Sequence, residues 1–277
     1  MRNTPAAARL AIAAFSSIML LGVAPPPAQS LYQSMYVVSG TGETHRQVGF
    51  AEALRRLMVK VSGDRRLAED PIVAGMVKNA GSYVNSFAYL DLKNGIPIHD
   101  EQGSYDRPHY LTVTFDQAKI DAALNGLHRK PWIARPRLAV FLGVQRNSKS
   151  YVVNANDDRD EAMRESFGNA SLLYGVPISF PDETLVAGRL QSFSAAQQAR
   201  VSDLDAAAKS AGEDQALLGT LVWSDPDRGW VADWTVSYQG QPVHWQLRGV
   251  SFDDAFRDGL SGAALVLSGN GKPGEHS

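Results

Sequence analysis

The stretch Pro131–Val144 reads PWIARPRLAVFLGV, in which a proline-stiffened connector runs directly into an apolar segment. Pro131 and Pro136 each fix φ and remove a backbone donor, so residues 129–136 predict a short, semi-rigid joint. Leu138–Val144 is nearly all apolar, which is typical of a strand buried on both faces in a sheet that helices cover. The sequence therefore predicts two small α/β units, one on each side of this joint.

The unit before the joint, residues 31–130, predicts the element order βααββα. Apolar residues at three- and four-residue spacing follow a capping box with Thr44 as N-cap and Gln47 at N3, which indicates an amphipathic helix that Gly63 ends. Alternation over His109–Phe115 indicates a strand with one buried face. We expect a layer of helices against a mostly antiparallel sheet.

The unit after the joint, residues 137–269, predicts the order βαβαβββα. One Ala- and Gln-rich helix is expected over Ser194–Ala211. Three strands are expected over Ala216–Trp223, Trp230–Tyr238 and Val243–Val250. Turn-forming residues join these strands, which predicts an antiparallel meander before a last helix. The fold class is therefore α/β (α+β), and the polar residues 270–277 are expected to be a disordered tail.

The first thirty residues have the features of a cleavable signal peptide. Arg2 and Arg9 precede the apolar run Leu10–Val23, which is shorter than the roughly 20 residues that a membrane-spanning helix needs. Small residues at Ala28–Ser30 predict cleavage after Ser30 and export to the periplasm. The chain has no cysteine, which fits an oxidising compartment and excludes a lipid-anchored N-terminal cysteine.

Charge and length narrow the class of protein further. Without residues 1–30 the chain has 25 basic and 29 acidic residues, a net charge of −4, which argues against a nucleic-acid partner because nucleic-acid contact faces are normally basic. The remaining chain is long enough for two domains of roughly 100–130 residues, each with its own core. No later segment is apolar for long enough to span a membrane, and we expect the mature protein to have no transmembrane segment.

Four of the five tryptophans, Trp223, Trp230, Trp234 and Trp245, fall in the predicted meander. Period-two counting places Trp230 and Trp234 on one strand face, which helices could cover or which could form an exposed platform that binds peptidoglycan or another glycan. We favour burial of Trp230 and Trp234 because contiguous exposed aromatic surface is uncommon. The four indoles are the candidate binding residues if the second interpretation holds.

Three further features could carry chemistry. Asp225 and Asp227 could serve as an acid–base pair, although neighbours in one turn seldom face each other across a sugar as a glycosidase requires. The Gly40–Gly42 turn resembles the start of a dinucleotide-binding loop, and His99–Glu101 offers polar ligands in one loop, but the other residues of such sites are missing. We therefore predict no catalytic, cofactor-binding or metal-ligating residues and no cofactor.

The run Phe50–Gly63, followed by Asp70-Pro71, by the strand ending at Asp116 and by Arg135-Pro136, resembles the uncharacterised proteobacterial family catalogued as domain of unknown function 2066. The segment Gly229–Trp234, with Trp245 and then Ser251–Asp253, resembles the C-terminal part of that family. The family has no established activity, so the resemblance implies none. By element order alone, the second unit also resembles small α/β domains of envelope assembly proteins, such as the N-terminal domain of the Tol translocation protein and the outer-membrane activators of cell-wall synthases, which bind other proteins.

These observations predict a periplasmic, non-catalytic binding or assembly module of the bacterial cell envelope, with an envelope protein as its partner. The alternative is an envelope protein that binds or hydrolyses a glycan through the Trp-rich meander and Asp225 or Asp227. No oligomeric state is predicted.

Overall fold

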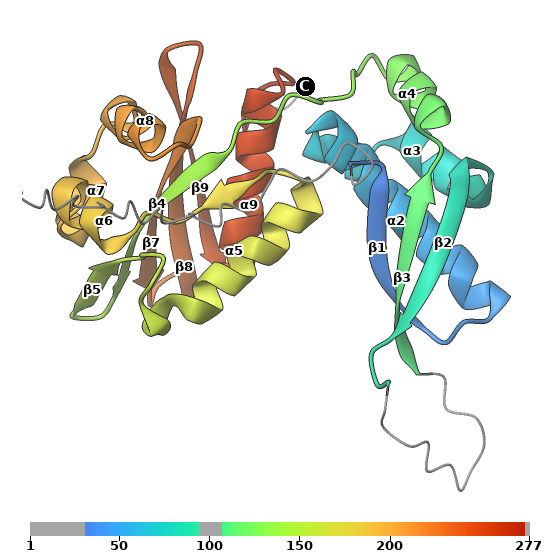
Figure 1. The fold of residues 1–277 in the computed structure, drawn as a ribbon, viewed down its shortest axis with the longest axis horizontal. Coiled ribbons are helices and arrows are strands. Elements are labelled where there is room, and N and C mark those ends of the chain that lie inside the picture. The colour runs from blue at the N-terminus through green and yellow to red at the C-terminus, as the bar shows by residue number, and fades with distance from the viewer. Residues whose placement is uncertain (1–30, 95–106, 275–277) are drawn as a thin grey trace, which may run out of the picture.

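The computed structural model describes residues 31–94 and 107–274, which form two α/β units connected by the proline segment (Figure 1). The elements before the joint are β1 (Gln33–Ser39), α2 (Glu43–Ser62), η1 (Arg65–Ala68), α3 (Pro71–Met76), η2 (Val77–Tyr83), β2 (Val84–Asp91), β3 (Pro108–Phe115) and α4 (Gln117–Gly126). The elements after it are β4 (Leu138–Arg146), β5 (Lys149–Val152), η3 (Asp158–Asp160), α5 (Glu161–Tyr174), β6 (Ile178–Ser179), α6 (Glu183–Arg189), α7 (Phe193–Gln198), α8 (Val201–Ser210), β7 (Gln215–Ser224), β8 (Gly229–Tyr238), β9 (Gln241–Val250) and α9 (Phe252–Leu267). The α/β fold class is confirmed.

The first unit is a three-stranded antiparallel sheet with the order β1-β3-β2, and α2 lies across one of its faces (Figure 1). Leu111 and Val113 of β3 are fully buried in one apolar cluster with Leu54 and Leu57 of α2. The alternation in β3 and the helical spacing in α2 therefore meet at a single interface, as the sequence predicts.

The start of α2 differs from the expected capping box. Gly42, not Thr44, is the N-cap, and it has no side-chain cap bond. Its extended backbone carbonyl accepts a hydrogen bond from the Arg46 N–H at 3.0 Å, so the helix begins at Glu43. The end is as expected, because Gly63 has a φ of 76° that favours glycine.

The second unit is a six-stranded mixed sheet with the order β5-β4-β7-β8-β9 and β6 beside β4. All residues of Leu138–Val144 are buried, so the expected double-sided burial of this strand is confirmed. Leu138, Val140 and Leu142 belong to one apolar cluster, while Ala139 and Phe141 belong to another. The expected meander is also present, since β7, β8 and β9 pair in antiparallel succession.

Helices cover both faces of this sheet. α5 and α9 lie on the side toward the first unit, and α6, α7 and α8 lie on the opposite side (Figure 1). The single helix expected over Ser194–Ala211 is wrong, because Ala199 and Arg200 adopt extended backbone and divide it into α7 and α8. Ala196 of α7 and Leu204 of α8 pack in the same cluster, so the break lets two short helices follow one sheet face. The short elements β5 and α6 were not expected.

Arg135 connects the two units at the joint. Its guanidinium donates to the carbonyl of Lys60 at the end of α2, and to the carbonyls of Tyr174 (2.8 Å) and Gly175 (3.1 Å) at the end of α5. It also stacks on Trp132, with 4.4 Å from Cζ to the ring centroid. The joint is therefore held against both units by one planar cation.

A second contact between the units comes from the segment expected to be a disordered tail. Asn270 donates from its amide to the Ser62 carbonyl at 2.8 Å, and its own carbonyl accepts from Arg66 at 2.7 Å. These bonds attach the chain after α9 to the end of α2. The expected tail residues 275–277 lie outside the described residues.

Candidate functional site

The tryptophans of the meander mostly form core. Trp234 is completely buried, and Trp230 and Trp245 are 7% and 6% exposed, so the expected burial of Trp230 and Trp234 is confirmed. Phe167 of α5 lies edge-to-face on Trp234 with ring centroids 5.7 Å apart, and Phe256 of α9 lies at 6.4 Å. The two helices that cover the sheet thus contact the indole directly.

Glycines leave room for these indoles. A Cβ on Gly219 of β7 would overlap the Trp234 ring, and one on Gly259 of α9 would lie 2.8 Å from its Cε2. A Cβ on Gly262 would lie 2.6 Å from Cε2 of Trp245. The large side chains of the meander are therefore matched by missing side chains on β7 and α9.

Trp223 differs from the other three because it is only half-buried. It lies opposite Trp230 in the β7–β8 register, with ring centroids 5.5 Å apart in an edge-to-face arrangement. The guanidinium carbon of Arg146 lies 5.0 Å from the Trp223 centroid, and the indole N–H donates to Asp225 at 2.8 Å. The indole thus has aromatic, cationic and carboxylate partners within the protein.

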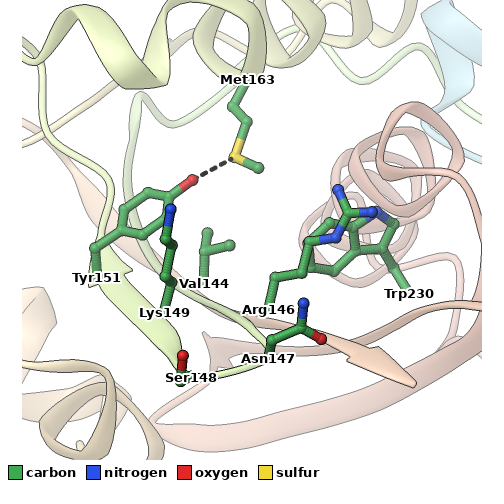
Figure 2. Close-up of a pocket in the computed structure, with 8 residues that line it drawn as sticks. All are labelled: Val144, Arg146, Asn147, Ser148, Lys149, Tyr151, Met163 and Trp230. Atoms are coloured by element: carbon green, nitrogen blue, oxygen red, sulfur yellow. Dashed lines mark hydrogen bonds between the residues drawn. The ribbon is translucent and has the colours of Figure 1, made fainter. Parts of the chain in front are cut away.

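A pocket of about 430 Å³ opens beside this cluster, between the β4–β5 hairpin and α5 (Figure 2). Its lining residues are Val144, Arg146, Asn147, Ser148, Lys149, Tyr151, Met163 and Trp230. Figure 2 shows Met163 at the top, reaching in from α5, with Tyr151 on the left, Trp230 on the right, and the turn residues Asn147 and Ser148 at the bottom. Apolar groups therefore form the interior and polar groups form the rim.

The hairpin register explains why the cations of the rim lie together. Asn147 and Ser148 form a two-residue turn in which Asn147 has a φ of 54°, and Arg146 pairs directly with Lys149. Val144 pairs with Tyr151 two residues further in, so these four side chains share the sheet face that points toward α5. Arg146 and Lys149 were not among the residues expected from the sequence, although two cations on either side of an Asn-Ser turn are a readable signal.

Several polar groups around the pocket have hydrogen-bond or ionic partners within the protein. The Tyr151 hydroxyl donates to Met163 Sδ at 3.7 Å, and burial, followed by the nearby Asp160, raises the pKa of Tyr151. The hydroxyl is therefore neutral and able to donate. Arg159 stacks toward Tyr151 but is bound to Asp157, and buried Asp160 accepts from the Asn154 N–H at 3.2 Å.

Asp225 and Asp227 both have partners in the β7–β8 turn. Asp225 accepts from the Trp223 indole, and Asp227 accepts from the Ser224 hydroxyl and forms an ion pair with Arg248 at 2.9 Å. The hydrogen bond from Ser224, followed by Arg248, holds the pKa of Asp227 below its ordinary value. Asp227 is thus held ionised and stabilises the turn.

The remaining candidates from the sequence have no site around them in the described residues. Gly40 has a φ of 87° and forms the turn before α2, as a tight turn requires. His99–Glu101 lies outside the described residues. Across residues 31–94 and 107–274, no group of three or more His, Asp or Glu side chains is arranged to hold a metal ion. Within the same ranges, none of the helices has the length and hydropathy needed to cross a membrane.

Comparison with protein families corrects the expected resemblance. Residues 27–133 match the model of a family described as a domain of unknown function (DUF8605). The resemblance to domain of unknown function 2066 is therefore wrong. The matched range covers the first unit and ends inside the joint. No curated protein and no solved structure matches the chain.

Proposed function

We propose that this protein is a binding module of the bacterial cell envelope, exported to the periplasm, whose first unit holds a partner protein. The periplasmic localisation is supported by the signal-peptide features of residues 1–30. The binding role is supported by the face of the three-stranded sheet that lies opposite α2. In the described part of the chain, no helix packs on this face.

The register of the sheet defines this face, which we name the open sheet face. Its residues are Gln33, Met35, Val37, Ser86, Ala88, Leu90, Tyr110, Thr112 and Thr114. None of the nine is charged, and Met35, Val37 and Leu90 are 46%, 47% and 60% exposed. An uncharged face that exposes several large apolar side chains is typical of an interaction site.

The lack of charge on the open sheet face also indicates what binds there. A charged partner residue would lose its hydration without gaining an ion pair, which is costly. We infer that the partner presents an uncharged, largely apolar surface. Seven of the nine exposed large hydrophobic residues in the described chain lie in the first unit, which favours this unit over the second as the docking part.

Site-specific photo-crosslinking in the native host tests the proposal. A photoreactive residue at Val37 or at Leu90 is expected to capture the same envelope protein, because both positions belong to one face. Leu172 of α5, which is 72% exposed, provides a matched apolar control outside this face. Leu90→Asp should abolish the adduct from Val37 without lowering the melting temperature. Adducts from Leu172 alone, or none from either position on the face, would contradict the proposal.

The proposed periplasmic localisation has its own test. Fractionation and N-terminal sequencing of the native protein should find it in the periplasm with Leu31 as its first residue. A cytoplasmic chain that still begins at Met1 would contradict export. That outcome would not affect the crosslinking test, which concerns binding at the open sheet face.

Glycan binding or hydrolysis at the meander is a second candidate, and the half-buried Trp223 supports it. Co-sedimentation with peptidoglycan that Trp223→Ala abolishes would favour binding. Turnover of peptidoglycan that Asp225→Asn or Asp227→Asn abolishes would favour hydrolysis. We rank this candidate second because Trp230, Trp234 and Trp245 offer almost no exposed ring surface.

A further inference from the structure

The pocket beside the β4–β5 hairpin contains two cations in an unfavourable arrangement. Arg146 and Lys149 are paired directly across the end of the hairpin, and both line the pocket. Like charges directly opposite each other on one sheet face destabilise the pair. An anion bound between the two side chains would offset this repulsion.

Within the described residues, no carboxylate supplies that anion. Arg146 stacks on Trp223, and neither Arg146 nor Lys149 forms an ion pair there. The acidic side chains around the pocket have other partners: Asp157 pairs with Arg159, Asp227 pairs with Arg248, Asp225 accepts from the Trp223 indole, and Asp160 accepts from the Asn154 N–H. Most other arginines of the second unit contact a carboxylate or a carbonyl, whereas Arg146, Arg189 and Arg228 have no such contact within the described residues.

The interior of the pocket restricts the ligand further. Val144 is almost completely buried at its floor, and Met163 and the edge of Trp230 form its walls. The faces of the nearby indoles are occupied, because Trp223 is covered by Arg146 and Trp230 is 7% exposed. A sugar ring therefore finds no free indole face in the pocket on which to stack, whereas an aliphatic group can pack against Val144 and the adaptable thioether of Met163.

We propose that this pocket binds a carboxylate carried on a short aliphatic group, with the carboxylate between Arg146 and Lys149 and the aliphatic group against Val144 and Met163. Arg146 can take both carboxylate oxygens with its planar fork while it stays stacked on Trp223. The Tyr151 hydroxyl and the Asn147 amide are further donors at the rim. Two natural sources have this chemistry, the C-terminus of a peptide that ends in an aliphatic residue and a fatty acid.

The site is tested by titrating small probes into the full exported chain and monitoring the NMR signal of the Met163 methyl group. The probes are hexanoate, N-acetyl-leucine, hexan-1-ol and inorganic phosphate. We expect saturable shifts with one or both carboxylates. Hexan-1-ol should bind at least about tenfold more weakly, because it cannot form charge-assisted hydrogen bonds to Arg146 and Lys149. Phosphate should also bind more weakly because it cannot use the apolar walls. Tighter binding of N-acetyl-leucine indicates a peptide terminus, and tighter binding of hexanoate indicates a fatty acid.

Arg146→Gln with Lys149→Gln should abolish carboxylate binding and leave the ligand-free protein folded. Removal of the like-charge pair should even raise the melting temperature slightly. Arg189→Gln with Lys209→Gln removes the same charge from α6 and α8 on the opposite sheet face and should leave binding unchanged. The inference is overturned if neither carboxylate binds saturably, if hexan-1-ol or phosphate binds as tightly, or if the Arg146/Lys149 variant binds like the native protein.

Discussion

Asp258 of α9 accepts a hydrogen bond from Arg65 at 2.5 Å, although 193 residues separate the two in the chain. The other carboxylate oxygen of Asp258 accepts from the Trp245 indole N–H at 3.0 Å. One carboxylate thus connects η1 of the first unit to a buried indole of the second. Because Asp258 is 11% exposed and Arg65 is 33% exposed, this ion pair is partly shielded from water.

This ion pair should contribute measurably to the attachment of the two units. In a double-mutant cycle of Arg65→Ala and Asp258→Ala, urea unfolding should give a coupling free energy of about 1 kcal/mol. The exposed pair Arg200–Asp203, whose side chains are 79% and 53% exposed, serves as the control and should give less than about 0.5 kcal/mol. Equal coupling energies in the two cycles would show that the Arg65–Asp258 contact has no special role.

The ionised Asp64 carboxylate should make the unfolding free energy of the first unit depend on pH in the acidic range. Burial by itself would raise the pKa of Asp64, but hydrogen bonds from Arg66 and Arg129 outweigh burial and lower it. A carboxyl whose folded pKa lies below its unfolded value stabilises the fold above about pH 4, and this contribution disappears as the pH falls through the lowered pKa.

Asp64→Asn tests this dependence. The variant should lose about 2 kcal/mol of unfolding free energy at neutral pH, less than for a fully buried pair because Arg66 and Arg129 are 30% and 27% exposed. Between pH 4 and pH 2 its unfolding free energy should then fall less steeply than that of the native protein. Arg129→Gln should give an intermediate slope. Native and Asp64→Asn proteins with the same slope would exclude Asp64 as the source.

The contact between Trp234 and its glycines should limit what the second unit tolerates. Trp234→Ala should cost about 3–5 kcal/mol and unfold the second unit, because it empties the centre of the cluster. Gly219→Ala should cost about 1–3 kcal/mol, because the new methyl group overlaps the indole. Gly168→Ala in α5 is the matched control, since it meets nothing within 4 Å and should stabilise by up to about 1 kcal/mol. Circular dichroism melts compare the three, and a tolerated Gly219→Ala would contradict the packing.

Arg135 should protect the joint from proteolysis. Trp132 is 9% exposed beneath the Arg135 guanidinium, so chymotrypsin should cut slowly after Trp132 in the native protein. Arg135→Gln removes the stacking cation and leaves buried carbonyls without donors, which should cost about 2–3 kcal/mol and speed this cleavage. Two stable fragments that divide near residue 132 would also establish that the units fold independently. Arg189→Gln, at an exposed position, is the control for the change in charge. Equal cleavage rates in the native protein and in both variants would contradict the role of Arg135.

Local chemistry explains why the helix and strand positions could be predicted from the sequence. Asp70, Asp116 and Ser251 accept N-cap hydrogen bonds in the structure, and Gly63 ends α2 with a positive φ. Such capping signals act between residues a few positions apart. The hydrophobic periods of strands and helices are also local patterns, and they predict which faces are buried. The break at Ala199 was missed because the Ala- and Gln-rich sequence favours a continuous helix, while the sheet it covers requires two.

The sequence by itself determined most of the strands and helices, though not β5, α6 or the break between α7 and α8, and it determined that Trp230 and Trp234 share a buried face. Only the tertiary structure decided that Arg146 and Lys149 lie opposite each other at a pocket, that Arg65 reaches Asp258, and that Gly219 faces Trp234. The contacts of Arg65 with Asp258 and of Gly219 with Trp234 join residues from different elements, so no local spacing encodes them. Arg146 and Lys149 flank one turn, but only the tertiary structure places them at a pocket beside Met163 of α5. Such contacts arise when whole faces pack together, because packing brings distant side chains to within a few ångströms.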